Sequence, residues 1–479
     1  MSSKRSGLNP YLPPWEYVPD GEPHVFGDRV YIYGSHDRFN GHAFCLNDYV
    51  GWSAPVDDLS DWRYEGVLYR RNEAPYNEDG ERALYAPDAC QGPDGRWYLY
   101  YALNGLSVIS VAVCDTPAGK FSYCGDVHYP DGTRLGERDG DEFQFDPAVL
   151  NEGDVTWLYS GFTPAAATFR TGAQAIRLGK DMLTITQDPV TVVPSPARAE
   201  GTGFEGHAFF EGSSMRKVNG NYYFIYSSER SHELCYAVSD RPDRGFAYGG
   251  TIVSNGDMGL PGIEKPVAFI GNNHGSIEQI RGQWYVFYHR QTNSSSFSRQ
   301  GCIEPIEILP DGSIPQVEIT SCGPNGGPLP GEGEYPAYAA CQLYLTQPPA
   351  VNPDFGQNPF PRITQETADA DPEDDPPDTS YIANLTPGVV IGFKYFDCRG
   401  IRRICVKVRG QCYAGGLSVY TDPDAEPLGT VPAGSSNEWH WESADIAVPD
   451  GVQALYFKVS GFGIFSLAAF RLETQGGMG

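Results

Sequence analysis

Five titratable residues stand at equivalent places in five similar stretches of the chain: Glu22, Asp88, Asp146, Glu211 and His274. Each comes just before a short strand-like segment. Two carboxyl groups across a cleft are the minimum needed to hydrolyse a glycosidic bond. One is protonated to assist the leaving oxygen, and the other is ionised to activate water. A third can raise the pKa of the acid and orient it. The residue types therefore indicate acid–base hydrolysis of sugars, provided that the fold gathers them.

The elements that must position these residues repeat along the chain. In the clearest copy, Glu211 opens a strand, Asn219-Gly220 forms a hairpin turn, and an aromatic run from Tyr222 to Ser227 follows. The five turns lie near residues 27, 94, 153, 219 and 281, which is 59 to 67 residues apart. Such a period, with several strands per unit, is typical of a propeller. We expect the five leading residues to converge at one end of its channel, where like charges raise each other's pKa.

The whole chain predicts an all-β protein with two domains. Residues 1–320 form a five-bladed β-propeller, the catalytic domain, whose last blade includes Val317 to Ile319. Residues 321–379 are rich in Pro, Gly and acids and predict a linker with one strand, Tyr338 to Leu345. Residues 380–475 predict a jelly-roll-like β-sandwich. There, Trp439 and Trp441 fit core packing or plain surface better than a stacking platform for a sugar.

The net charge and the cysteine content limit the classes of partner and the cellular location that we expect. The 479 residues carry a formal net charge of -27 with a pI near 4.6, which disfavours nucleic acid and anionic membranes and suits a neutral oligosaccharide substrate. The eleven cysteines contain no CxxC pair and predict reduced thiols. Residues 1–10 lack the apolar core of a signal peptide, so a cytoplasmic location is expected. The sequence is also compatible with a homo-oligomer.

Several motifs resemble glycoside hydrolase family 43. They are Asp146-Pro147, Glu211-Gly212, His274-Gly275-Ser276 and Tyr288-His289-Arg290. The resemblance covers roughly residues 15 to 320. It implies five-bladed propellers that act with inversion, mostly α-L-arabinofuranosidases, β-xylosidases and arabinanases. The chain from Ile391 onward is similar to the β-sandwich modules, some of them carbohydrate-binding, that are appended to such enzymes.

The resemblance implies catalytic roles. Glu211 matches the general acid, and Asp146 matches the residue that orients it and modulates its pKa. Glu22 falls where the family has its general base, normally an Asp in an Asp-Pro pair. Because a Glu reaches one methylene further, this departure puts the position of the activated water in doubt. Asp20 and Asp37 are the alternative bases.

The resemblance also implies binding roles. His274 matches the axial histidine that lies over a calcium ion or a water in the channel of some members. It is therefore the predicted metal ligand, although no cofactor is implied as required. Arg290 matches an arginine that contacts the substrate or the acid. Asp88 is expected in the sugar-binding subsite, and we expect His274 to contribute to substrate binding as well.

Together these observations predict an inverting, exo-acting hydrolase that releases terminal arabinofuranose or xylose from oligosaccharides derived from plant polysaccharides. Exo action is inferred from long insertions at residues 36–51 and 70–85, which would close one end of the cleft. Two alternatives stay open: an exo-β-galactosidase on the same scaffold, and a catalytically silent sugar-binding propeller.

Overall fold

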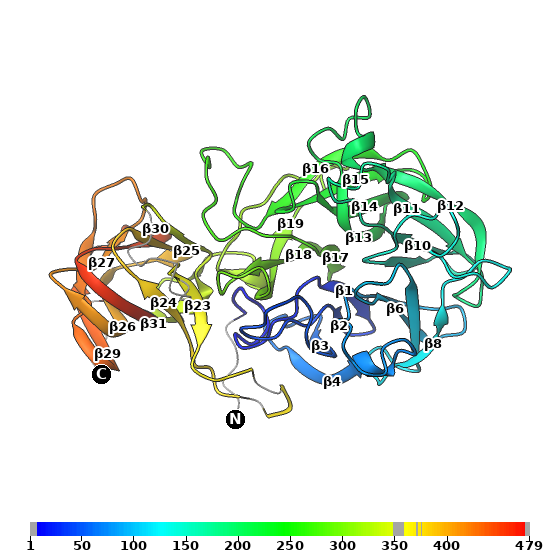
Figure 1. The fold of residues 1–479 in the computed structure, drawn as a ribbon. Helices are drawn as coiled ribbons and strands as arrows, with labels where there is room; N and C mark the ends of the chain where they lie inside the picture. The colour runs from blue at the N-terminus through cyan, green and yellow to red at the C-terminus, as the bar shows by residue number, and fades with distance from the viewer. Residues whose placement is uncertain (1–6, 348–358, 370–371, 375, 475–479) are drawn as a thin grey trace.

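The computed structural model describes residues 7–347, 359–369, 372–374 and 376–474. It contains a propeller followed by a sandwich, both built of β-strands (Figure 1). The five sheets of the propeller are antiparallel, and within each sheet the strands follow chain order.

The blades are formed by the following strands. Blade one contains β1 (Glu22–Phe26), β2 (Arg29–Tyr33), β3 (Tyr49–Pro55) and β4 (Arg63–Tyr69). Blade two contains β5 (Asp88–Gln91), β6 (Trp97–Ala102), β7 (Ile109–Cys114) and β8 (Ser122–Asp126). Blade three contains β9 (Ala148–Asn151), β10 (Thr156–Ser160), β11 (Gly172–Leu178) and β12 (Ile185–Pro194). Blade four contains β13 (Phe209–Val218), β14 (Asn221–Ser228), β15 (Glu233–Ser239) and β16 (Ala247–Ser254). Blade five contains β17 (Ser276–Ile280), β18 (Gln283–Gln291) and β19 (Arg299–Ile306).

The inner hairpins form where the turn residues predict them. Asn219 and Gly220 have φ angles of 51° and 89°, and Arg281 and Gly282 have 51° and 87°. Two consecutive positive φ values match the twist of the flanking strands, which is the reason that Asn-Gly favours this turn.

The hydrophobic core of the propeller lies between its blades. Five clusters of buried residues each join two neighbouring sheets, and one of them packs Ile280 and Phe287 of blade five against Val30 and Trp52 of blade one. The innermost strands also contact one another around the centre. The ring is therefore closed, and the prediction of a five-bladed propeller is confirmed.

The outer edge of blade five differs from the expectation. The N-terminal segment covers it: the amide of Tyr11 donates to the carbonyl of Gly301 at 3.1 Å, and the Oδ1 of Asn9 accepts from the amide of Ile303 at 2.9 Å. Val317 instead forms a parallel bridge with Val253 of blade four. The expectation that residues 317–319 complete the last blade is therefore wrong, since the beginning of the chain already occupies that edge.

The C-terminal domain is a sandwich of two six-stranded sheets. The first contains β20 (Leu329–Pro330), β22 (Gln342–Leu345), β25 (Val389–Cys398), β27 (Gly416–Tyr420), β28 (Gly429–Pro432) and β30 (Gly451–Val459). The second contains β21 (Gly333–Pro336), β23 (Arg362–Gln365), β24 (Ser380–Leu385), β26 (Ile401–Tyr413), β29 (Ser435–Asp445) and β31 (Phe462–Thr474). A single apolar cluster, which includes Phe393, Phe457 and Phe470, lies between them.

The linker prediction needs correction. Four strands of the sandwich, β20 to β23, lie within residues 321–379, where one was expected. Short strands between Pro and Gly residues carry little sequence periodicity, and only pairing with β25, β31 and β24 reveals them. Parts of the predicted linker, at residues 348–358, 370–371 and 375, lie outside the described residues, as does residue 475 of the predicted sandwich.

All eleven cysteines are free thiols, as predicted, and all except Cys114 and Cys124 are buried. Within the described residues, no helix has the length and apolar character that membrane crossing requires.

Candidate active site

Glu211 is aimed into the centre of the ring by an irregularity in β13. The register between β13 and β14 shifts on both sides of Glu211, and the next residue, Gly212, has a φ of +72°. A Cβ at Gly212 would lie 3.1 Å from the ring of His274, so only glycine fits there without displacing the histidine. A bulge of this kind re-aims a side chain, as is common next to active sites.

Asp146 lies beside Glu211. Its Oδ2 accepts a hydrogen bond from the amide of Gly212 at 3.1 Å, and it lies 3.8 Å from the Nδ1 of His274. Asp146 has a φ of 45°, a left-handed conformation that an Asp tolerates better than most residues and that often marks a functional position. The predicted pairing of Asp146 with Glu211 is therefore present.

The third carboxylate of this group is Asp20, which also has a left-handed φ, of 58°. The Nη1 of Arg299 donates to both of its oxygens, at 2.9 and 3.0 Å. The same guanidinium binds Asp37 through Nε and Nη2, at 2.9 Å each. Sequence reasoning missed Arg299, because a lone arginine at a strand start carries no motif. The role of Arg299 becomes visible only in the structure, where the start of β19 faces Asp20.

A chain of hydrogen bonds links Asp20 to Glu211. The amide of Asp20 donates to the Nδ1 of His289 at 3.3 Å, and the Nε2 of His289 donates to the carbonyl of Asn272 at 2.7 Å. The Nδ2 of Asn272 in turn donates to Glu211 at 3.5 Å. Since a carbonyl only accepts, the proton of the neutral His289 ring is on Nε2.

Electrostatics give the three carboxyls different pKa values. Burial and the charge of Asp20 raise the pKa of Glu211 to about 7. Burial, with the charges of Glu211 and Asp20, raises the pKa of Asp146 well above its usual range. Burial also acts to raise the pKa of Asp20, but the charge of Arg299 outweighs it and holds this pKa far below the usual value. Glu211 is thus suited to carry a proton while Asp20 is ionised.

Glu22 lies elsewhere, and the expectation that it faces Glu211 is corrected. Its Oε2 accepts from the hydroxyl of Ser214 at 3.1 Å and from the Nη2 of Arg216 at 3.0 Å. Ser214 and Arg216 lie three and five residues beyond Glu211 on β13, so the carboxylate of Glu22 points deeper into the channel. Burial and the charge of Asp88 raise the pKa of Glu22 well above its usual range, which does not suit a base.

Asp88 and Arg290 are structural. Asp88 is completely buried, and it accepts hydrogen bonds from the Nε2 of His24 at 2.6 Å and from the amide of Val149 at 2.7 Å, which ties blade two to blade three. The Nη1 of Arg290 donates at 3.1 Å to the carbonyls of Ala340 and Cys341, and thus joins the propeller to the sandwich. The expected sugar contact of Asp88 and substrate contact of Arg290 are therefore wrong, since both side chains are used inside the protein.

His274 lies 3.9 Å from Asp20 and 3.8 Å from Asp146 through Nδ1, and its Nε2 has no hydrogen-bond partner among the described residues. Burial lowers the pKa of His274 to about 4, so the ring is neutral at ordinary pH. Its buried position between the two carboxylates is consistent with the predicted place in the channel.

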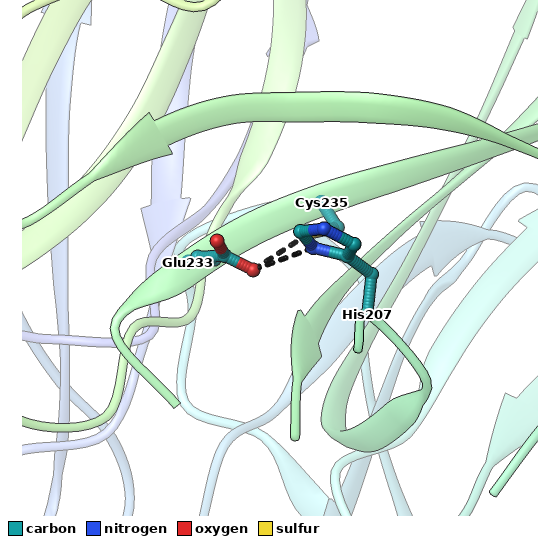
Figure 2. Close-up of side chains that lie close together, drawn as sticks. All are labelled: His207, Glu233 and Cys235. Atoms are coloured by element: carbon teal, nitrogen blue, oxygen red, sulfur yellow. Dashed lines mark hydrogen bonds and ion pairs between the residues drawn. The ribbon is translucent and has the colours of Figure 1, made fainter. Parts of the chain in front are cut away.

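Metal-competent donors lie away from His274. Among the described residues, two groups of such donors converge: Glu22, His24 and Asp88, and His207, Glu233 and Cys235. Figure 2 shows the second group, in which the Nδ1 of His207 lies 2.8 Å from the Oε2 of Glu233. That oxygen also accepts from Ser228 at 2.9 Å. Hydrogen bonds thus already occupy the donors, and the described residues give no protein ligand set that includes His274.

A wall of half-buried aromatic rings adjoins the carboxyls. Phe145 precedes Asp146, Phe210 precedes Glu211, and both rings pack on Phe162, at centroid distances of 5.2 and 5.5 Å. Tyr85 continues the wall at 5.0 Å from Phe145. Ring faces next to acids are the usual platform for a sugar ring. Phe210 lies on the inner strand β13, whereas Tyr85, Phe145 and Phe162 lie in loops between strands.

The two tryptophans of the sandwich have arginine partners. The guanidinium of Arg409 lies 4.3 Å from the ring centroid of Trp439, and that of Arg471 lies 4.7 Å from the ring of Trp441. Trp439 also donates to Glu366 at 3.2 Å. These contacts agree with the packing interpretation.

Comparison with known proteins gives consistent matches. The family described as "Glycosyl hydrolases family 43" matches residues 19–314. A xylosidase/arabinosidase of Thermoclostridium stercorarium is 58% identical over 98% of this chain and 100% of its own length. Xylosidase/arabinosidase 43A of Humicola insolens is 31% identical over 57% of this chain and 88% of its own length.

Solved structures of similar proteins agree with these sequence matches. An arabinoxylan arabinofuranohydrolase of Bacillus subtilis, in complex with cellotetraose, superposes with a TM-score of 0.53 over 98% of both chains; at 22% identity it supports the fold alone. The GH43_1 enzyme of Xanthomonas citri, complexed with xylose, has a TM-score of 0.53 and 26% identity, over 67% of this chain and 95% of its own.

Proposed function

Since the chain belongs to glycosyl hydrolase family 43 and is a glycosidase, we propose that it releases terminal arabinofuranose or xylose from oligosaccharides by an inverting, exo-acting mechanism. The observation that carries the catalytic assignment is the contrast between two buried carboxyls. Glu211 has a pKa near 7, and Asp20 is held ionised by Arg299.

In this proposal Glu211 is the general acid. It transfers its proton to the glycosidic oxygen as the bond between that oxygen and the anomeric carbon breaks. Asp20 is the general base, which accepts a proton from a water molecule as this water attacks the opposite face of the anomeric carbon. Asp146 orients Glu211 through the amide of Gly212. One proton leaves Glu211 for the departing glycosidic oxygen, one passes from the water to Asp20, and the configuration at the anomeric carbon inverts.

Asp20 is preferred to Glu22 as the base for a geometric reason. Asp20 is joined to Glu211 through His289 and Asn272, whereas Glu22 is engaged by Arg216 deeper in the channel. Asp37 is the other candidate for the general base. It binds the guanidinium of Arg299 and so positions the arginine that pairs with Asp20. The Pro19-Asp20-Gly21 stretch thus replaces Glu22 in the expected role.

The choice of sugar follows from the relatives. The Thermoclostridium stercorarium protein, similar over nearly the whole chain, is a xylosidase/arabinosidase, and the aromatic wall beside Glu211 suits the face of one sugar ring. Exo action is supported by the long loops that precede β3 and β5. A cytoplasmic location stays a prediction, which cell fractionation would test.

Hydrolysis of 4-nitrophenyl glycosides of α-L-arabinofuranose, β-D-xylose and β-D-galactose tests the sugar. We expect turnover of one or both pentosides. Turnover of the galactoside alone would favour the exo-β-galactosidase, and no turnover of any would favour the silent binder. Proton NMR of the first-formed sugar distinguishes inversion from retention.

The acid role has its own test. Glu211→Gln should abolish turnover of natural oligosaccharides and spare the nitrophenyl glycosides more, because nitrophenolate leaves without a proton. Asp154→Asn, at an exposed acid in a hairpin turn, is the matched control. Equal losses on both substrate types would contradict the assignment.

A further inference from the structure

Arg299 is held by two loops from different blades. The blade-one loop, residues 34–48, supplies Asp37, which binds the guanidinium, and Phe44, whose ring centroid lies 4.8 Å from it. The blade-five loop, residues 292–298, leads directly into Arg299 at the start of β19. The position of the guanidinium, and through it that of Asp20, therefore depends on both loops.

The two loops are joined to each other. The Nδ2 of Asn293 donates to the Oδ1 of Asn40 at 3.0 Å, and the rings of Phe297 and Phe44 meet edge to face at 4.8 Å. These contacts close a cover over Arg299, which is 2% exposed.

The C-terminal domain holds the blade-one loop through one carboxylate. The Oδ1 of Asp369 accepts from the amide of Phe39 at 3.1 Å, and its Oδ2 accepts from the Nδ2 of Asn47 at 3.4 Å. The Nε of Arg38 lies 3.7 Å from the same Oδ2. All three partners belong to the loop that carries Asp37 and Phe44.

The same segment of the sandwich holds the blade-five loop. The amide of Ile363, on β23, donates to the carbonyl of Thr292 at 3.0 Å, and the carbonyl of Pro361 accepts from the hydroxyl of Ser294 at 2.8 Å. In Figure 1 the yellow chain after β23 extends from the sandwich toward β4, and residues 372–374 contact that strand. One stretch, residues 361–369, thus contacts both loops.

We propose that residues 361–369 of the C-terminal domain are a clamp that positions the general base. Asp369 and the backbone of β23 fix the two loops, the loops fix Arg299, and Arg299 fixes Asp20 and keeps it ionised. The clamp rests on the proposed role of Asp20. It assigns to the sandwich a part in catalysis that requires no sugar bound to the sandwich, so it applies equally to a one-sugar substrate.

The clamp is tested by Asp369→Ala in the full chain. We expect kcat/KM on a one-sugar nitrophenyl pentoside to fall about tenfold or more, mostly through kcat, because misplacement of a catalytic group slows the reaction. The acid limb of the pH profile should move to higher pH, since Arg299 then stabilises the Asp20 carboxylate less. Asp369→Asn can still accept a hydrogen bond from the amide of Phe39. Its kcat/KM should therefore lie between those of Asp369→Ala and the native protein.

Glu366→Ala is the matched control. Glu366 lies three residues earlier in the same segment, but it binds Arg409 and Trp439 within the sandwich. It should leave kcat and the pH profile unchanged. If Asp369→Ala behaves like Glu366→Ala while the native protein hydrolyses the pentoside, the clamp is wrong and the proposed function stands.

A measurement that needs no turnover separates a failure of the clamp from a failure of the proposed function. Hydrogen–deuterium exchange of residues 36–47 and 292–299 should become faster in Asp369→Ala and stay as in the native protein in Glu366→Ala. Unchanged exchange in Asp369→Ala would overturn the clamp whether or not any glycoside is hydrolysed. Absence of turnover by the native protein would instead count against the proposed function.

Discussion

Arg299 donates from a single nitrogen to both oxygens of Asp20, at 2.9 and 3.0 Å. The contact joins the start of β19 to a residue two positions before β1, so it spans the junction where the propeller ring closes. It also sets the charge state of the site. A guanidinium keeps its proton at any ordinary pH, and therefore it keeps Asp20 ionised beside a Glu211 that carries a proton.

Replacing this arginine should impair the base. We expect Arg299→Lys to lower kcat/KM by about a hundredfold, because an ammonium cannot bind Asp20 and Asp37 with the same geometry. The pKa of Asp20 should rise, and the acid limb of the profile should move upward with it. Arg281→Lys, in an exposed hairpin turn, is the control. A loss of activity without a shift of the acid limb would contradict the role given to Arg299.

Two variants decide which acid is the base. Asp20→Asn should lower kcat by about 10²–10⁴-fold, and it should also lower the melting temperature because it breaks the buried pair with Arg299. Glu22→Gln should keep most activity, because Ser214 and Arg216 engage the carboxyl of Glu22 deeper in the channel. Steady-state kinetics and thermal unfolding measure both. A loss of activity in Glu22→Gln but not in Asp20→Asn would restore Glu22 as the base.

The pH dependence of hydrolysis should be asymmetric. With its pKa raised to about 7, Glu211 loses its proton as the pH rises through 7, and kcat/KM on oligosaccharides should fall there. The pKa of Asp20 is lowered, so activity should persist on the acid side well below the usual range of an aspartate. A profile that stays flat up to pH 9 would contradict the acid assignment.

Glu304 should make stability depend on pH. Burial raises the pKa of Glu304 from 4.5 to about 8, although it accepts hydrogen bonds from Thr320 and Asn9. Because the folded-state pKa is raised, its contribution to stability is complete below about pH 4.5 and is lost as the pH rises through 8. Glu304→Gln, which mimics the protonated form, should raise the melting temperature at pH 8 to 9 by at least about 2 °C and leave it unchanged near pH 5.

Glu307→Gln serves as the control for this prediction. Glu307 is exposed and lies three residues further along the chain. Its substitution should leave the pH dependence of the melting temperature as in the native protein. Parallel curves for the native protein and Glu304→Gln would show that Glu304 does not titrate in this range.

Local sequence was sufficient for the repeating parts of the protein. Asn219-Gly220 predicts its turn because few residue pairs accept two positive φ angles, and the aromatic run after it predicts a strand. The 59- to 67-residue period predicts the propeller, and the prediction that Glu211 and Asp146 meet rests on the shared position of both residues in that repeat. These inferences depend on neighbours in the chain, which a sequence displays directly.

The sequence by itself determined the all-β class, the ring of five blades and the pairing of Glu211 with Asp146. Only the tertiary structure decided that Asp20 rather than Glu22 joins them, that Arg290 serves the domain interface, and that Arg299 and Asp369 support the site. The reason is physical: these choices depend on contacts between segments up to about 330 residues apart, such as Phe39 with Asp369. A side chain's role at such a contact is set by what faces it, and the order of residues along the chain does not record that.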